Sequence, residues 1–267
     1  MSQITVAVNG ALGRMGQQVM SAVIADPSFS LTCASDIKAD KEYVVLPGHA
    51  QKIPLHSNLT ALIEMYHPDV VVDFTVAGAA INSARLALKN GSNMVIGTTG
   101  VTAAEIKEIG QLAIRYQKGA IVAANFSIGA VILIHLAKIA AKYFDNAEII
   151  ELHHDKKIDA PSGTALATAE AMLKARGRPF IIPPTEKETL KGTRGGQKDG
   201  ISIHSVRVPG MVASQEVIFG ALGQTLVLRH DTINRESFMP GVMLAIKEVV
   251  KRRGLVVGLE TLLDLGD

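Results

Sequence analysis

The sequence predicts an α/β protein with a Rossmann-like, doubly wound parallel sheet and an inserted mixed α+β domain. Apolar, strand-like runs alternate with helical patterns in the first half of the 267-residue chain, which is the rhythm of a parallel sheet with crossover helices. A glycine-rich turn follows the first of these runs. Hydrophobic residues make up 48% and aromatic residues 4%, with 24 glycines, which suits a core of small aliphatic side chains and tight turns.

The first domain is expected over residues 1–126, completed by residues 236–267. Its strand patterns lie at 4–8, 30–35, 69–74, 93–97 and 120–123. Helical patterns separate them, at 14–25, 59–66, 77–90 and 102–117. The strand at 69–74 is uniformly apolar between two aspartates, which is typical of a strand buried on both faces. Residues 38–58 show no clear pattern and remain unassigned.

The second domain is expected over residues 127–235, where the alternation breaks. A long apolar helix (128–143), a strand (147–153) and a helix (164–176) come first. Residues 183–200 are rich in Pro, Gly, Thr and charge, which predicts a long mobile loop. Three strands with short glycine-containing links follow, expected to be antiparallel, at 201–208, 215–221 and 225–229. A helix at 237–252 is expected to pack back on the first domain.

The charge balance and the single cysteine exclude several classes of protein. Lys and Arg number 27 against 25 Asp and Glu, and so small an excess argues against nucleic acid as a partner. Cys33 stands alone, so neither an internal disulfide nor a zinc ribbon is possible, and no metal site is expected. No stretch reaches the roughly 18 apolar residues of a membrane helix, and the N-terminus lacks a signal-peptide pattern. We expect a soluble, cytoplasmic protein that acts on a small molecule.

The turn after the first strand predicts a dinucleotide site. Gly10 permits the sharp turn, Gly13 lets the backbone approach a pyrophosphate, and Gly16 lets helix and strand pack closely. The free N–H groups of the helix that follows favour an anion. Asp36 ends the second strand, 20 residues after Gly16, where a carboxylate would accept the adenosine ribose hydroxyls. The alternative is a turn that serves packing alone, since the spacing is GxxGxxG and not GxGxxG.

Small and hydroxylated residues recur where later strands end. They occur at Phe74-Thr75, Gly97–Gly100 and Ala123–Ser127. Ligands of open α/β sheets bind at the carboxyl ends of the strands, so these residues are candidates for a nicotinamide pocket. The alternative is that Thr and Gly simply form βα turns.

The segment Glu151–Thr164 is the most informative part of the sequence. A strand delivers His153 and His154, which point to opposite sides if the strand stays extended. Lys157 follows, and then a helix begins, with Pro161 expected in its first turn. The free N–H groups around residues 162–164 form a cradle for a carboxylate or phosphate. The alternative for a single histidine is an ordinary hydrogen-bonded group, but this clustering favours a binding site.

At this point the sequence resembles the 4-hydroxy-tetrahydrodipicolinate reductase family, also called dihydrodipicolinate reductase, over nearly the whole chain. The run HHxxKxDAPSGTA within residues 153–165 is very specific. The other motifs that carry the resemblance are GALGRMG (10–16), GTTG (97–100), AANFSIG (123–129), IHSVRVPG (203–210) and GLETLL (258–263). The resemblance implies an NAD(P)H-dependent oxidoreductase of the diaminopimelate route to lysine, a homotetramer whose inserted domain supplies the subunit contacts.

The resemblance also implies the site residues. His153 matches the proton donor, Lys157 a lysine that donates a proton or binds substrate, and His154 a substrate-binding histidine. Gly163 and Thr164 match the carboxylate cradle. The positions matching the cofactor site are Gly10, Ala11, Leu12, Gly13, Arg14, Met15, Asp36, Gly97, Thr98, Thr99, Ala123, Ala124, Asn125 and Phe126.

The reaction that the resemblance implies agrees with these residue types. The substrate is a small ring dianion, so cations and helix N–H groups must hold its two carboxylates. Hydride adds to the ring carbon opposite the nitrogen, and a neighbouring carbon then takes a proton, which a histidine with a free pKa of about 6.5 can donate at neutral pH. Many members carry an arginine after the acidic ribose residue. Here Ile37 stands there and Lys38 follows, so we expect use of both NADH and NADPH.

Two other classes of protein fit parts of the sequence. One is a different two-domain nicotinamide enzyme, such as a semialdehyde dehydrogenase, which needs a nucleophilic cysteine, or a sugar dehydrogenase, which does not need the PSGT cradle. Cys33 lies inside the second predicted strand, a place more typical of a core residue. The other is a nucleotide-sensing protein without catalysis, which would not need His153 and Lys157 together.

Overall fold

The structure is a computed structural model that describes residues 3–265. The chain forms two compact units. The first comprises the residues up to Ile128 and those from Phe238 onward, and the second comprises Gly129–Ser237. The first unit is therefore built from two separate parts of the chain, and the second is inserted between them.

The first unit contains an eight-stranded sheet in the order β13-β7-β6-β5-β1-β2-β4-β3. All neighbouring strands are parallel except β3 and β4, which pair antiparallel. The strands are β1 (Ile4–Asn9), β2 (Phe29–Ser35), β3 (Tyr43–Val44), β4 (Ile53–His56), β5 (Val70–Asp73), β6 (Asn93–Ile96), β7 (Gly119–Val122) and β13 (Gly254–Val257). This confirms the predicted doubly wound parallel sheet.

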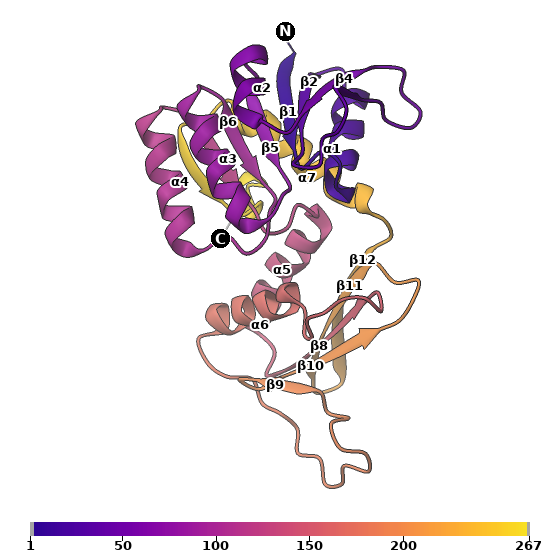
Figure 1. Cartoon of the computed structure of the whole chain (residues 1–267). Helices are drawn as coiled ribbons and strands as arrows, with labels where there is room; N and C mark the ends of the chain where they lie inside the picture. Colours follow the sequence, from indigo (N-terminus) through magenta and orange to yellow (C-terminus); the bar gives the residue numbers. More distant parts are fainter. Residues whose placement is uncertain (1–2, 266–267) are drawn as a thin grey trace. The chain divides into compact units, whose positions relative to one another are not determined.

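Helices cover both faces of this sheet (Figure 1). On one face α1 (Arg14–Ala25) packs against α7 (Met239–Val249). On the other, α3 (Ala77–Lys89) lies between α2 (Leu59–Tyr66) and α4 (Ala103–Arg115). Local sequence defines where these helices begin: the Asn58 side chain caps α2, and a capping box between Thr102 and Glu105 starts α4.

The order of the strands reverses at β1. The chain runs from β1 through β2 to β4 in one direction, and from β5 through β6 to β7 in the other. The connections that leave β1 and β5 therefore diverge above the carboxyl ends of these two strands. Such a switch point is where open α/β sheets bind their ligands, because a crevice opens between the diverging turns.

The second unit contains a five-stranded sheet in the order β12-β11-β8-β10-β9. Its strands are β8 (Asn146–His153), β9 (Gly196–Lys198), β10 (Ile201–Arg207), β11 (Ala213–Ala221) and β12 (Gln224–Thr232). Two helices, α5 (Ile128–Ala140) and α6 (Gly163–Arg176), pack on this sheet (Figure 1). Alternate residues of β8, such as Ala147 and Ile149, point into the core that these helices cover.

The expected antiparallel arrangement of the late strands is partly wrong. β11 is antiparallel to β8 and β12, but β10 pairs parallel with β8 and antiparallel with β9. β8 takes the centre of the sheet, so β10 and β11 lie on opposite sides of it although they follow one another in the chain. Four strands were not predicted: β3, β4, β9 and β13 are all short. β9 (Gly196–Lys198) corrects the end of the predicted 183–200 loop, because it pairs antiparallel with β10, and β13 adds parallel to β7 at the edge of the first sheet.

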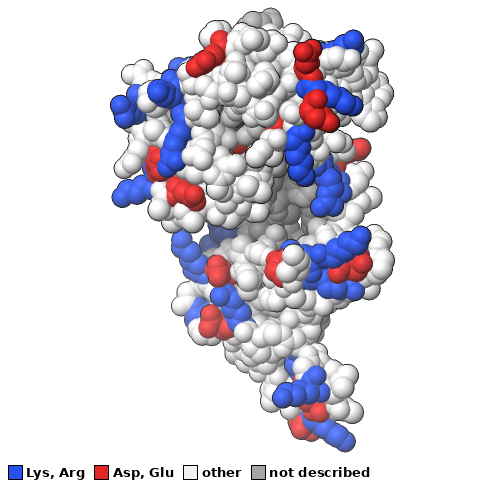
Figure 2. All heavy atoms as spheres, in the orientation of Figure 1, with Lys and Arg blue, Asp and Glu red and all other residues white. Residues whose placement is uncertain are grey.

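Charged side chains of both signs are interspersed on the surface in Figure 2, with wide uncharged areas between them. This distribution agrees with a formal net charge of only +2. Within residues 3–265, no helix is long and apolar enough to span a membrane.

The close packing of α7 gives a test of the fold. Gly241 lies in the first turn of α7, and a Cβ there would stand 2.1 Å from the carbonyl oxygen of Phe126. Gly241→Ala should therefore lower the free energy of unfolding by about 1–3 kcal/mol, although alanine is the better helix former. Gly78 in the first turn of α3 has nothing within 4 Å of its Cβ position. Gly78→Ala should be neutral or stabilise by up to about 1 kcal/mol. Urea unfolding curves compare the two variants, and equal stabilities would contradict the tight contact at Gly241.

Candidate functional site

The glycine-rich turn joins β1 to α1 and leaves an anion-binding helix end. Gly10 has φ +81°, and a Cβ on it would lie 2.8 Å from the carbonyl oxygen of Phe74. A Cβ on Gly16 would lie 2.1 Å from the carbonyl oxygen of Gly10, so the helix starts directly against the turn. Gly13 is the N-cap of α1 and supplies no side-chain cap. The N–H groups of Arg14 and Met15 in the first turn have no acceptor within the helix, so they are available to an anion.

Asp36 stands at the end of β2 and is 9% exposed. One carboxylate oxygen accepts the N–H of Leu12 at 2.9 Å, and the other accepts the N–H of Lys38 at 3.0 Å. Each oxygen can accept one more hydrogen bond. Asp36 therefore holds the glycine-rich turn through the Leu12 N–H, and its two oxygens can still accept hydrogen bonds from a pair of hydroxyl groups.

A pocket of about 650 Å³ adjoins the turn at Leu12. Its other lining residues are Asp40, Lys41, Glu42, Tyr43, Val44, Val45 and Leu55. The ammonium group of Lys52 lies 4.6 Å from the centre of the Tyr43 ring. Sequence reasoning missed this pocket, because it is built by the short β3–β4 ribbon within the unassigned segment.

A buried carboxylate, Asp73, joins the ends of three neighbouring strands. It is 0% exposed and accepts hydrogen bonds from Asn9, the last residue of β1 (2.8 Å), from Thr75 after β5 (2.7 Å) and from Thr98 after β6 (2.9 Å). The predicted cofactor residue Thr98 therefore uses its hydroxyl to hold its own loop. Thr99, the next residue, is exposed.

The ring of Phe74 fills the space above Gly97, where a Cβ would lie 2.1 Å from the ring. Phe126, another predicted cofactor residue, is 2% exposed, and its ring centre lies 5.9 Å from that of Phe74. Phe126 thus contributes to packing. Ala123 is buried beside it at the end of β7, whereas Ala124 is exposed. The predicted cofactor residues lie in turns at the carboxyl ends of β1, β2, β6 and β7, at one edge of the parallel sheet.

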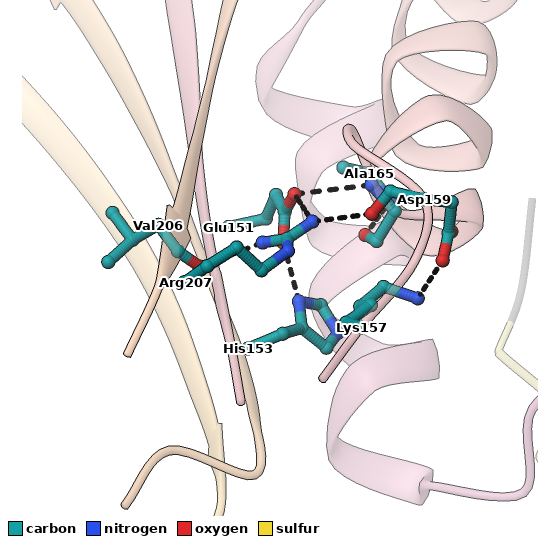
Figure 3. A network of polar contacts seen from close by, with 8 residues as sticks. Glu151, His153, Lys157, Asp159, Ala165, Val206 and Arg207 are labelled. Carbon is teal, nitrogen blue, oxygen red and sulfur yellow. Dashed lines mark hydrogen bonds and ion pairs between the residues drawn. The ribbon is translucent and has the colours of Figure 1, made fainter. Parts of the chain in front are cut away.

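In the second unit, the polar residues of the predicted site gather around Glu151 (Figure 3). Its side chain points from β8 into the core and is 0% exposed. Arg207, from the neighbouring strand β10, donates two hydrogen bonds to the carboxylate, at 2.9 and 2.7 Å. Burial by itself would raise the pKa of Glu151, but hydrogen bonds, first of all from Arg207, hold it below its usual value. The carboxylate is therefore ionised at neutral pH.

His153 ends β8, two residues beyond Glu151 and on the same face of the strand. Its Nδ1 lies 2.5 Å from the Glu151 carboxylate. Burial lowers the pKa of His153 below the usual value, Glu151 opposes this shift, and the charges of Lys157 and Arg207 add to it. The ring is thus anchored through Nδ1, and Nε2 remains for a ligand.

Lys157 and the start of α6 form the expected anion-binding group, but a carboxylate of the chain engages them. The Lys157 ammonium lies 2.7 Å from the Asp159 carboxylate. This contact lowers the pKa of Asp159, and the Gly163 N–H contributes to the shift. His154 follows the strand, and its carbonyl accepts the N–H of Lys157 at 3.2 Å.

Two details of the predicted helix start are corrected. Pro161 lies before the helix and not in its first turn, because Ser162 is the N-cap and α6 begins at Gly163. The Ser162 N–H is not available to a ligand, because it donates to Glu151 at 3.2 Å. The Ser162 hydroxyl accepts the N–H of Ala165. The cradle therefore consists of the N–H groups of Gly163 and Thr164, which have no acceptor within the helix.

Sequence reasoning missed Glu151, Arg207 and Asp159 as members of the site. One clue was present for Glu151. The alternation of β8 places Ala147, Ile149 and Glu151 on the face that the helices bury, and an ionised group on a core face needs a partner. Arg207 comes from a strand that starts 50 residues later, so only strand pairing brings it to Glu151.

The structure also bears on the alternative classes of protein. Cys33 is buried in β2, and burial raises the pKa of its thiol to about 11. It is therefore unsuited as the thiolate nucleophile of a semialdehyde dehydrogenase. Within residues 3–265, no group of three or more His, Cys, Asp and Glu is placed to hold a metal ion.

Family models match the chain over both units. The model of the dihydrodipicolinate reductase N-terminus matches residues 4–126, and that of the dihydrodipicolinate reductase C-terminus matches residues 129–263. The 4-hydroxy-tetrahydrodipicolinate reductase of Dehalococcoides mccartyi strain CBDB1 is 50% identical over 265 residues, covering 99% of this chain and 100% of that protein. The corresponding reductase of Moorella thermoacetica is 47% identical over 266 residues, covering 98% of each chain.

A solved structure agrees with these relatives. The dipicolinate-bound dihydrodipicolinate reductase from Paenisporosarcina sp. TG-14 is 42% identical and superimposes with a TM-score of 0.87, covering 97% of this chain and 99% of that one. The sequence motifs, the parallel sheet with its inserted second unit, and relatives at half identity over the full length all agree: the chain belongs to the dihydrodipicolinate reductase family, a family of oxidoreductases.

Proposed function

We propose that the protein catalyses the NAD(P)H-dependent reduction of 4-hydroxy-tetrahydrodipicolinate, or of dihydrodipicolinate formed from it, to tetrahydrodipicolinate in the diaminopimelate route to lysine. The first unit binds the cofactor, and the second binds the substrate. The observation that carries the proposal is His153 anchored on Glu151 in the same segment as Lys157 and the open start of α6. Relatives with half of their residues identical bear the name of this activity.

One assay tests the activity directly. Purified protein is mixed with NADH and freshly made product of the preceding synthase, and absorbance is followed at the NADH band. A fall that depends on both protein and substrate supports the proposal. A protein that binds NADH without oxidising it would instead fit a nucleotide-sensing role, and oxidation with another carbonyl compound would fit a different dehydrogenase.

The second unit suits a ring with two carboxylates. Lys157 supplies a cation, and Gly163 and Thr164 supply helix N–H groups that bind a carboxylate in the manner of a helix N-terminus. His154, in the same segment, is a further candidate for a contact with the substrate. Asp159 now engages Lys157 and Gly163, so a substrate carboxylate takes over these contacts from Asp159 when it binds. The Paenisporosarcina reductase, with dipicolinate bound, shows that a relative accepts a pyridine dicarboxylate.

His153 is the proton donor in this proposal. In the free protein its pKa is lowered, mainly by burial. A substrate dianion beside the ring would favour the imidazolium, because an opposite charge at close range raises the pKa of a histidine. Substrate binding therefore supplies the protonated state that the reaction needs. Nε2 then gives its proton to the ring carbon next to the one that received hydride.

The first unit suits a nicotinamide dinucleotide. The bound cofactor supplies the hydride. The uncapped start of α1 holds the pyrophosphate, and Asp36 accepts the ribose hydroxyls of the adenosine. The pocket that starts at Leu12 suits the adenosine end. Asp73 keeps the turns after β1, β5 and β6 in place for the nicotinamide end.

The protein is a cytoplasmic homotetramer in this proposal, with the second unit supplying the contacts. Side chains on the sheet face away from α5 and α6 include Ile150, Leu152, Ile218 and Val227, and Val227 is 47% exposed. The same face also carries Glu148 and Glu216, and a mixed face of exposed apolar and charged side chains is suited to a second copy of the chain. Light scattering of the purified protein measures the assembly.

His153→Gln should lower kcat by about 10²- to 10⁴-fold, the usual range for loss of a general acid. The dissociation constant for NADH should stay unchanged, because His153 lies outside the cofactor unit. His154→Gln is the matched variant and should raise KM more than it lowers kcat. Steady-state kinetics and NADH fluorescence titration give these values. A His153→Gln enzyme with more than half the wild-type turnover, under conditions where chemistry limits the rate, would exclude His153 as the donor.

Pyridine dicarboxylates should inhibit competitively with substrate, and the Lys157–Asp159 pair should control their affinity. Lys157→Ala should weaken inhibition about 10- to 100-fold, because a charge-assisted hydrogen bond of roughly 1.5–3 kcal/mol is lost. Asp159→Asn should strengthen it, since the competing carboxylate charge is gone. Lys156→Ala, which removes an exposed neighbouring charge, serves as the control. Equal inhibition constants for wild type and Lys157→Ala would show that Lys157 does not contact a carboxylate.

Both cofactors should be used, with NADH at least as efficient as NADPH. The Asp36 carboxylate suits ribose hydroxyls and repels a 2′-phosphate, whereas the exposed Arg14 and Lys38 attract it. Ile37 is 90% exposed, so Ile37→Arg should fit and shift preference toward NADPH, more strongly at low salt. Met65 is exposed on α2, so Met65→Arg is the control that adds the same charge away from Asp36. The ratio of kcat/KM values decides the matter, and a wild-type preference for NADPH of about tenfold or more, about 1.4 kcal/mol, would contradict this assignment.

A further inference from the structure

A fully buried carboxylate lies behind His153, and all of its acceptor positions are taken. One oxygen of Glu151 accepts from Arg207 at 2.7 Å and from the Ser162 N–H at 3.2 Å. The other accepts from Arg207 at 2.9 Å and contacts Nδ1 of His153 at 2.5 Å. Figure 3 shows the Arg207 guanidinium and the His153 ring close to the Glu151 carboxylate, with dashed lines marking the contacts.

These contacts determine the tautomer of His153. An ionised carboxylate can only accept hydrogen bonds, and the two hydrogen bonds from the Arg207 guanidinium hold the pKa of Glu151 below its usual value, so that Glu151 is ionised at neutral pH. Nδ1 must therefore carry the hydrogen and donate it to Glu151. In the neutral ring Nε2 is then the basic nitrogen, and any proton that the ring takes up or releases passes through Nε2.

We infer that Glu151, held in place by Arg207, is the positioning residue that keeps His153 in its Nδ1–H form and directs Nε2 toward the substrate. The inference rests on the proposed function, in which His153 gives a proton. Glu151 itself is 0% exposed, so it acts on the reaction through the groups that it holds, and His153 is the one among them that gives a proton.

Arg207 connects the same arrangement to the binding loop. Besides its two bonds to Glu151, it donates to the carbonyl oxygen of Asp159 at 2.7 Å. Glu151 in turn accepts the N–H of Ser162, the N-cap of α6. One buried ion pair thus fixes the proton donor, the loop that carries Lys157 and the first turn of the carboxylate cradle relative to one another.

The charged groups that face His153 are Glu151 from β8, Arg207 from β10, and Lys157 from the loop. The carboxylate favours the imidazolium, and the two cations oppose it. Turnover needs protonated His153, so it is present below the pKa of His153 and is lost as the pH rises through that pKa. Removing the negative charge lowers this pKa and moves the loss of kcat to lower pH. Removing Arg207 leaves the carboxylate charge unbalanced and moves the loss to higher pH.

The second unit offers a matched control on the same strand. Glu148 also contacts a histidine and an arginine, His204 at 2.8 Å and Arg194 at 2.5 Å. Like Glu151 it pairs with one histidine and one arginine, but it is 32% exposed and does not contact His153. Glu148→Gln therefore measures how far the loss of a paired carboxylate on β8 alters the pH profile when His153 is not contacted.

The experiment compares pH profiles of kcat for the holoenzyme with NADH. Glu151→Gln should shift the alkaline limb down by about one pH unit or more, Arg207→Met should shift it up, and Glu148→Gln should leave it in place. NADH affinity should be the same in all three. Combining Glu151→Gln with His153→Gln should slow the enzyme no further than His153→Gln alone, because both changes remove one function. Opposite limb shifts and this lack of additivity support the inference, since a general loss of structure would produce neither.

Arg207→Met or Glu151→Gln leaves one member of the buried ion pair without its partner, and such a variant can fail to fold. A measurement on the wild type tests the inference without these variants. The ¹⁵N spectrum of histidine-labelled protein, assigned by the signal that His153→Gln removes, should show a protonated Nδ1 across the pH range and a titrating Nε2. Two results overturn the inference even in an active enzyme. One is an Nδ1 of His153 without its hydrogen, and the other is an alkaline limb of the kcat profile of Glu151→Gln at the same pH as in the wild type. Failure of the wild type to oxidise NADH with the synthase product contradicts the proposed function, and that result is read independently of the spectrum.

Discussion

The arrangement of the second unit depends on one buried ion pair, that between Glu151 and Arg207. A carboxylate without exposure to water is tolerated only when its charge and its acceptor positions are matched by donors. Here two guanidinium N–H groups, a backbone N–H and an imidazole satisfy it together. Because each partner comes from a different place in the chain, satisfying this one group fixes where β10, the end of β8 and the start of α6 lie.

The first unit applies the same principle with neutral partners. Asp73 is also fully buried, and it is satisfied by the amide of Asn9 and the hydroxyls of Thr75 and Thr98. Its partners come from the ends of three parallel strands, which side-by-side pairing brings to one edge of the sheet. In both units a buried carboxylate organises turns that leave backbone N–H groups available, at the start of α1 in one and of α6 in the other. Such helix ends suit anionic ligands, which the proposed cofactor and substrate both are.

Several residues that a motif marks as ligand-binding also have a structural task. Thr98 holds its own loop, Phe126 packs against Phe74, and the Ser162 N–H is used by Glu151. Asp159, outside the predicted set, engages the lysine and the helix N–H that a substrate carboxylate would use. A motif therefore does not by itself show the task of each of its residues, and the division of work among them follows from the contacts that each side chain makes.

The sequence by itself determined the fold class, the main helices and strands of both units, and the segments that carry the glycine-rich turn and the histidine–lysine group. These features depend on local patterns: apolar periodicity, glycine in turns and capping residues act over a few neighbours in the chain. Only the tertiary structure decided that β10 pairs parallel with β8, that β13 joins β7, and that Arg207 meets Glu151. These features depend on pairing between strands far apart in sequence. No local pattern records which strand becomes a neighbour, and a carboxylate on a buried face shows that it needs a partner without showing which residue provides it.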